Sequence, residues 1–81
     1  MATQLTEEIR TRGGIVRSAR TVEQALRLID EDLPVELRNL PRWTFARALL
    51  VEAQRTGAKK DMRTAVRQLK QALSNEKWLA A

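Results

Sequence analysis

NLPRWTFARALL, residues 39–50, holds two of the chain's three aromatic residues and indicates how the chain folds. Pro41 suits the first turn of a helix, where its missing N–H group leaves no hydrogen bond unmade, and Asn39 is a suitable N-cap. Gly57 is suited to the left-handed conformation that ends many helices. The stretch therefore predicts a helix from about residue 40 to residue 56.

An apolar arc on this helix predicts that it packs in the core. When residues are placed about 100° apart, one group forms the centre of the arc: Ala46, Leu49, Leu50 and Ala53. Phe45 lies at one edge of the arc and Trp43 at the other, beside Arg47. Trp43 is expected to pack in the core. The alternative is an exposed aromatic platform on which nucleic-acid bases stack.

Thr21 and Gln24 have the spacing of a capping box and predict another helix. An apolar stripe follows at helical spacing, formed by Val22, Ala25, Leu26, Ile29 and Leu33. Glu23 and Arg27 are expected to pair at i,i+4 on the outer face. Pro34 follows three acidic residues and stops the helix. We expect this helix to cover residues 21–32.

A third helix is predicted at about residues 61–73, with Asp61 as its N-cap. Its apolar stripe comprises Met62, Ala65, Val66, Leu69, Ala72 and Leu73. Arg63, Arg67 and Lys70 form a basic strip along one flank. Like charges at this spacing are mildly destabilising, so the strip is either tolerated surface or used in binding.

The segment before residue 21 predicts a β-hairpin over about residues 5–20. Gly13 and Gly14 can supply the positive φ angles of a two-residue turn, between short strands around residues 5–9 and 15–16. The alternative is a brief helix from Thr6 to Gly13, so residues 4–12 are strand or helix. An isolated hairpin is marginal in water and must pack on the helices or on a second chain.

These elements predict an α+β fold that is mostly helical, a short N-terminal β-hairpin packed on three α-helices. With 81 residues, we expect a single small domain over residues 1–81. A domain of this size buries about 60% of the surface that its unfolded chain exposes. Trp78 and Leu79 follow the last helix and are expected to cover the core or to contact another chain.

The composition excludes several classes of site. The chain has no Cys and no His, which removes thiol chemistry, disulfides, the commonest general base and the commonest metal ligand. No apolar run is long enough for a membrane span, and no glycine motif fits a phosphate cradle. We therefore expect a soluble, non-enzymatic protein with no metal, no cofactor and no membrane partner, and the cytoplasm fits the absence of Cys.

A helix-turn-helix is a weighed alternative. Ala53, Gly57 and Val66 fall at the small, turn and late apolar positions of that motif, with residues 61–73 as the recognition helix. Other positions depart from it: Glu52, Thr56 and Arg63 stand where the motif wants apolar residues. The connection through residues 57–61 is also too long for the motif.

From Val16 to about Ala72, the order of motifs resembles a family of short proteobacterial domains of unknown function. The order is a strand-like V-R-S, then T-V-E-Q-A-L, L-P, an Ala-rich helix ended by Gly57, and a helix with R-T-A-V. Leu33-Pro34 stands where the family is expected to have Trp-Pro. The resemblance implies a hairpin followed by helices and no assigned activity, so it transfers no functional residue.

The expected function is that of a small binding module in the bacterial cytoplasm. Its net charge of +5, concentrated in the second half of the chain, favours an anionic partner. One possibility is protein–protein interaction or a weak homodimer through Trp78 and Leu79. The other is weak, largely non-specific nucleic-acid binding through a basic set: Arg63, Arg67, Lys70, Arg47 and Arg55.

Overall fold

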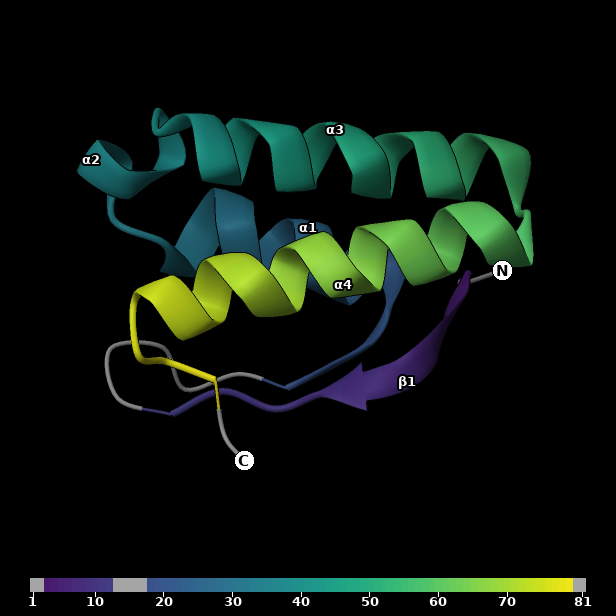
Figure 1. The fold of residues 1–81 in the computed structure, drawn as a ribbon, viewed down its shortest axis with the longest axis horizontal. Coiled ribbons are helices and arrows are strands. Elements are labelled where there is room, and N and C mark those ends of the chain that lie inside the picture. Colours follow the sequence, from purple (N-terminus) through teal and green to yellow (C-terminus); the bar gives the residue numbers. More distant parts are fainter. Residues whose placement is uncertain (1–2, 13–17, 80–81) are drawn as a thin grey trace.

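A computed structural model describes residues 3–12 and 18–79 (Figure 1). The order of elements along the chain is β1 (Gln4–Ile9), β2 (Ala19–Thr21), α1 (Val22–Arg27), the π-helix η1 (Leu28–Asp32), α2 (Val35–Arg38), α3 (Pro41–Thr56) and α4 (Lys59–Asn75). The predicted α+β class is confirmed: an antiparallel pair of strands precedes helices that make up most of the chain.

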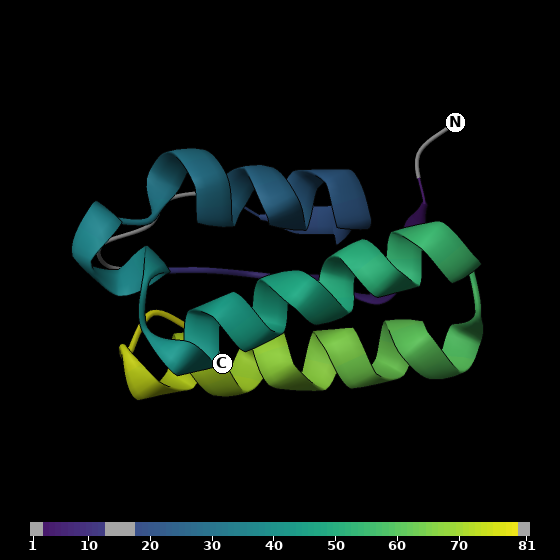
Figure 2. The same ribbon diagram turned by 90° about the horizontal axis from the view of Figure 1, so that it is seen from above.

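The helices form a layer that lies over the hairpin. α3 and α4 run antiparallel and pack closely, and α1 also lies against α3, behind α4 in the view of Figure 1 (Figures 1 and 2). β1 lies below α4 and runs in the same direction, while β2 leads directly into α1 (Figure 1). α4 therefore contacts both α3 and β1, and its outer flank borders the hairpin.

Trp43 lies in the centre of the core, and its side chain is fully buried. It packs with residues from β1, α1, η1 and α4 in one cluster. The core interpretation of the α3 arc is therefore right for Trp43, although we expected it at the edge. Phe45 is 54% exposed and Val51 41%, so the expectation that Phe45 borders the core is wrong. The face of α3 that carries Trp43 points into the core, because α1 and α4 both pack against it.

The hairpin is antiparallel, with Gln4 opposite Thr21 and Ile9 opposite Ala19. The two pairs differ in register, so the ladder contains an irregularity between Gln4 and Ile9. Residues 4–9 are strand, which decides against the alternative helix. The predicted Gly13-Gly14 turn and the strand residues 15–16 lie outside the described residues. β2 begins only at Ala19.

Of the two hydrogen bonds of the capping box predicted at the start of α1, one is present. The Gln24 N–H donates to Thr21 Oγ1 at 3.1 Å, but the Gln24 side chain accepts from the Arg20 N–H rather than from the cap residue itself. Thr21 is also the last residue of β2 and pairs with Gln4. The last turn of the predicted 21–32 helix is the π-helix η1, closed by the Leu33 N–H and the Leu28 carbonyl.

The two other predicted N-caps are wrong, whereas Gly57 ends α3 in the left-handed conformation, as predicted. α3 is capped by Leu40 and α4 by Ala58, neither through a side chain. Asn39 instead ends the short helix α2, which the sequence did not predict. Asp61 lies inside the first turn of α4, where its negative charge interacts favourably with the helix dipole. Its carboxylate accepts a hydrogen bond from Thr56 Oγ1. α4 therefore begins two residues earlier and ends two residues later than predicted.

No helix in the described part of the chain is long and apolar enough to span a bilayer.

Candidate binding groove between β1 and α4

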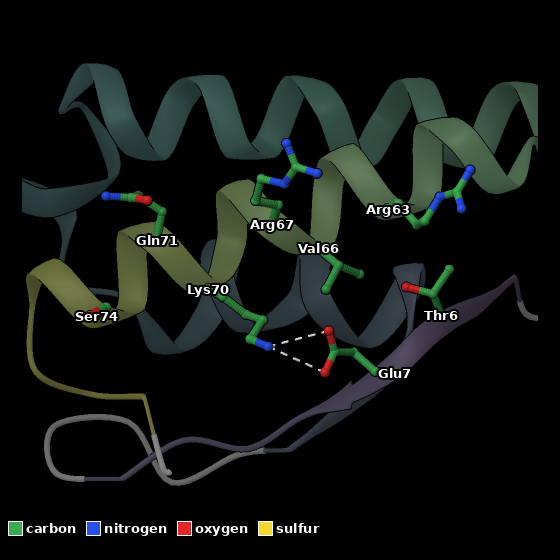
Figure 3. Close-up of a pocket in the computed structure, with 8 residues that line it drawn as sticks. All are labelled: Thr6, Glu7, Arg63, Val66, Arg67, Lys70, Gln71 and Ser74. Atoms are coloured by element: carbon green, nitrogen blue, oxygen red, sulfur yellow. Dashed lines mark hydrogen bonds and ion pairs between the residues drawn. The ribbon is translucent and has the colours of Figure 1, made fainter.

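The basic strip predicted on the last helix borders a groove. Because α4 is one regular helix from Lys59 to Asn75, residues three and four apart share a face. Arg63, Arg67 and Lys70 thus lie on one flank of α4, from which Lys70 points towards β1 and Arg67 points away from it (Figure 3). The first turn adds Lys59 and Lys60.

The groove has a volume of about 500 Å³ and lies between β1 and this flank (Figure 3). Its lining comes from two strand residues and six helix residues: Thr6, Glu7, Arg63, Val66, Arg67, Lys70, Gln71 and Ser74. Val66 is buried and forms an apolar patch of its wall, while the other lining side chains are polar or charged. The groove can therefore hold a polar, anionic group against a small apolar surface.

Lys70 and Glu7 form an ion pair across the groove. Lys70 Nζ lies 3.3 Å from both carboxylate oxygens of Glu7 (Figure 3). Glu7 lies on β1 between the buried Leu5 and Ile9, at a position that alternation turns towards the helices. A charged residue at such a position reaches the edge of the core and contacts a cation there.

Arg63 and Arg67 are exposed and make no ion pair with any described residue. The other arginines on the described helices each have a hydrogen-bond acceptor or a carboxylate partner: Arg27, Arg38, Arg42, Arg47 and Arg55. Figure 3 shows the Arg67 guanidinium directed away from Glu7, so it does not share the Lys70 contact. Two guanidinium groups at the groove are therefore available to a ligand.

A second hollow of about 510 Å³ continues the groove towards the start of β1. It is lined by Thr3, Gln4, Leu5, Thr6, Gly57, Lys59 and Met62, and it shares Thr6 with the first hollow. Lys59 and Lys60 lie in the first turn of α4, where the helix dipole disfavours cations and favours anions. Cationic side chains thus line both hollows, Lys59 in the second and Arg63, Arg67 and Lys70 in the first.

The structure does not bring Arg47 and Arg55 to this groove. Arg47 donates two hydrogen bonds to Asp30 of η1, at 2.9 and 3.2 Å. These bonds lower the pKa of Asp30 and raise the pKa of Arg47. Arg55 is hydrogen-bonded to Glu52 on α3 itself, which lowers the pKa of that carboxyl. Both arginines are used within the fold and lie away from the basic strip.

Trp78 and Leu79 are half-buried and pack against the core. The Trp78 N–H donates to the Leu73 carbonyl at 2.9 Å, and its own carbonyl accepts from the Arg12 N–H at 2.8 Å. Leu79 forms an isolated antiparallel bridge with Thr11. The C-terminal residues predicted as an interface therefore close the lower side of the domain.

The side chains of the groove suit contacts with anionic groups. Guanidinium and ammonium groups donate charge-assisted hydrogen bonds to carboxylates or phosphates. Thr6 and Ser74 supply hydroxyl groups, but no described residue accepts a hydrogen bond from either of them. The described residues contain no cluster of three or more acidic side chains that could hold a metal ion.

Comparisons with protein-family models, curated proteins and solved structures give no match to this chain. The resemblance to short proteobacterial domains stays a prediction.

The sequence did not identify Thr6 and Glu7 as groove residues. Glu7 carries a weak signal, because a charge between Leu5 and Ile9 interrupts the apolar face of a strand. Its partner lies 63 residues away, and only the packing of β1 under α4 brings the two together.

Proposed function

We propose that this protein is a non-enzymatic binding module that holds an acidic segment of a partner protein in the β1–α4 groove. The observation that carries the proposal is a pair of exposed arginines, Arg63 and Arg67. They have no carboxylate partner among the described residues, and they lie on a helix that packs against β1. Along α4, the five cations Lys59, Lys60, Arg63, Arg67 and Lys70 stand against the single carboxylate of Asp61. An acidic ligand relieves the repulsion among these cations.

A protein ligand fits the groove better than a nucleic acid does. Binding of single strands commonly uses aromatic side chains on which bases stack. No aromatic residue lines the groove: Trp43 is in the core, Phe45 lies on α3, and Trp78 packs under the domain. The Glu7 carboxylate inside the groove repels phosphates and carboxylates alike, so it does not separate the two ligands, and nucleic acid is the competing outcome of the test.

Binding of a labelled polyglutamate, followed by fluorescence anisotropy, tests the proposal. The double substitution Arg63→Gln/Arg67→Gln should weaken binding about 10-fold, because it removes two charge-assisted contacts. The matched control is Arg27→Gln/Arg55→Gln, which removes the same charge from exposed pairs on α1 and α3. Equal weakening by both variants would show that net charge alone binds the polymer, and the groove would then have no role.

Self-association is a second candidate, and it rests on the outer face of α3. Phe45, Ala48 and Val51 recur three residues apart on this face, and all three are exposed. In an antiparallel pair of α3 helices centred on Ala48, Phe45 of one copy faces Val51 of the other. Such an arrangement is self-complementary, as a two-fold interface must be.

Sedimentation at rising protein concentration tests this second candidate. Phe45→Gln should abolish a dimer formed through α3, whereas Val35→Gln, at an exposed apolar site on α2, should leave it intact. A dimer that survives both substitutions rules out the α3 face, and a monomer at all concentrations rules out self-association.

A further inference from the structure

We propose that the acidic partner binds as an extended strand that adds to the open edge of β1, with acidic side chains at alternate positions. This inference rests on the proposed function and specifies how the groove holds its ligand. It stands on three features: the open edge of β1, a strand contact already made beside it, and the spacing of the cations on α4.

The open edge of β1 faces the groove. Among the described residues the sheet has two strands, so β1 pairs with β2 along one edge only. β2 contacts α1, whereas β1 contacts α4, so the unused edge of β1 lies on the α4 side. The two hollows lie along the same side of β1, from Thr3 to Glu7. An edge strand beside a groove presents backbone N–H and carbonyl groups for strand addition.

Just beyond β1, the chain already makes such a contact with its own C-terminal segment. Thr11 and Leu79 form an antiparallel bridge, and the Arg12 N–H donates to the Trp78 carbonyl. Trp78 and Leu79 follow the end of α4, and the C-terminal segment turns back from α4 to the hairpin (Figure 1). A ligand strand along residues 4–8 extends the same line of pairing.

The cations on α4 have the spacing that an extended ligand needs. Arg63 and Arg67 are four residues apart, which is about 6 Å along a helix. Side chains at alternate positions of a strand are about 6.8 Å apart on one face. β1 and α4 run in the same direction (Figure 1), so a strand that follows β1 passes Arg63 and Arg67 in turn. Two acidic residues separated by one residue therefore come level with Arg63 and Arg67. The exposed Arg67 side chain, which Figure 3 shows directed away from Glu7, turns towards the ligand when it binds.

The Glu7 carboxylate lies where a third carboxylate of the ligand would bind. Its two oxygens both lie 3.3 Å from Lys70 Nζ, three residues along α4 from Arg67. A third alternate acidic residue of the ligand competes with Glu7 for this ammonium group. The groove therefore favours a short segment of the pattern acidic-x-acidic, and from Thr3 to Glu7 it accommodates about five extended residues, or about 17 Å.

Backbone-modified peptides test strand addition separately from charge. The probe is a fluorescein-labelled peptide in which glutamate alternates with threonine. Two further peptides have the same sequence, but one carries N-methyl groups on its glutamates and the other on its threonines. Each removes the N–H donors along one edge of the strand without changing the charge. We expect one methylated peptide to bind about 10-fold more weakly than the parent, because its N–H groups no longer reach β1.

Amide hydrogen exchange supplies the structural readout. Bound peptide should slow exchange at backbone amides within residues 4–8 of β1, and the Arg63→Gln/Arg67→Gln variant should show less slowing. If both methylated peptides bind as tightly as the parent and β1 exchange is unchanged, strand addition is overturned while binding of an acidic partner stands. If no peptide binds, or if an oligothymidylate binds more tightly than the parent peptide, the proposed function is overturned as well.

Discussion

The ammonium group of Lys70 lies 3.3 Å from both carboxylate oxygens of Glu7, which joins α4 to β1 in the groove. Both side chains are about half exposed, at 40% and 52%, so water screens the pair and its contribution to folding is small. Under the proposed function the pair matters more for binding, since Glu7 occupies a cation that the acidic ligand would contact. Glu7 would then compete with the ligand for Lys70.

Glu7→Gln should therefore tighten binding of an acidic peptide by about threefold, because it frees Lys70 and removes a repelling charge. Its cost in stability should be no more than about 0.5 kcal/mol. Anisotropy titration and chemical denaturation measure the two quantities. The control is Glu31→Gln, which makes the same charge change beside Arg27, away from the groove. Unchanged or weaker binding by Glu7→Gln would contradict a carboxylate-binding role for Lys70.

Trp43 and Phe45 are aromatic residues on the same helix, but their substitution by alanine should lower the stability of the protein by very different amounts. Trp43→Ala removes a fully buried side chain and should cost about 3–5 kcal/mol, a large part of the stability of a small domain. Phe45→Ala acts at a side chain that is 54% exposed and should cost about 1 kcal/mol or less. Urea denaturation compares the two, and similar costs would place Phe45 in a buried contact.

Trp43 also has a buried Nε1 atom with no hydrogen-bond partner among the described residues. A buried N–H group without an acceptor lowers stability by about 1–3 kcal/mol. Trp43→Phe removes this N–H group, which partly offsets the cost of the smaller side chain. The stability of Trp43→Phe should therefore be much closer to that of the natural protein than the stability of Trp43→Ala is.

The sequence predicted the helices well and the outer surface of α3 poorly. Thr21, Pro41 and Gly57 are local signals, because each acts through its own backbone, and α1 and α3 begin and end near them. The choice of which face of α3 points into the core does not depend on such local signals. α3 carries apolar residues nearly all round, so periodicity alone does not decide between Trp43 and Phe45. That choice depends on α1 and α4, which pack on one side of the helix.

The candidate site could be predicted only in part for the same reason. Helical spacing placed Arg63, Arg67 and Lys70 on one flank, and that arrangement depends on α4 alone. The groove needs β1, and the pairing of Arg47 with Asp30 needs η1 against α3. These contacts join residues 17 to 63 positions apart, where sequence spacing carries no information.

Glu23 should make the stability of the domain depend on pH. Its carboxylate accepts from the Thr3 N–H at 2.8 Å and from Gln54 Nε2 at 2.6 Å, and so joins the start of the hairpin to α1 and α3. The sequence predicts a pair between Glu23 and Arg27, but Arg27 Nε lies 3.7 Å from Glu31 Oε2 instead. Burial raises the pKa of Glu23, but the hydrogen bonds outweigh it, and the pKa lies below its ordinary value of 4.5.

A carboxyl group with a lowered pKa stabilises the folded state above its unfolded pKa, and this contribution is lost as the pH falls through the folded pKa. We expect Glu23→Gln to lower stability by about 1 kcal/mol at neutral pH and to make the loss of stability below pH 4.5 less steep. Thermal unfolding at a series of pH values measures this slope. Glu31→Gln is the control, and an identical slope in both variants would assign the acid dependence to other carboxylates.

Gly57 and Lys77 both have positive φ angles, +67° and +61°, at the C-terminal ends of α3 and α4. Gly57 adopts this conformation without strain, whereas Lys77 carries a Cβ atom that disfavours it. Lys77 is held there by two hydrogen bonds, from its own N–H to the Ser74 carbonyl and from the Trp78 N–H to the Leu73 carbonyl. This is the pattern of a Schellman motif, in which glycine is usual at the position of Lys77.

Substitutions at these two positions should therefore change stability in opposite directions. Gly57→Ala should cost about 1 kcal/mol, and since no atom lies within 4 Å of the added Cβ, the cost comes from the backbone alone. Gly57→Asn should cost less, because Asn tolerates the left-handed region. Lys77→Gly should stabilise the protein by a few tenths to about 1 kcal/mol, the relief of strain exceeding the entropy that glycine adds to the unfolded chain. Urea denaturation ranks the variants, and a destabilised Lys77→Gly would mean that the Lys77 side chain, rather than its backbone, secures the end of α4.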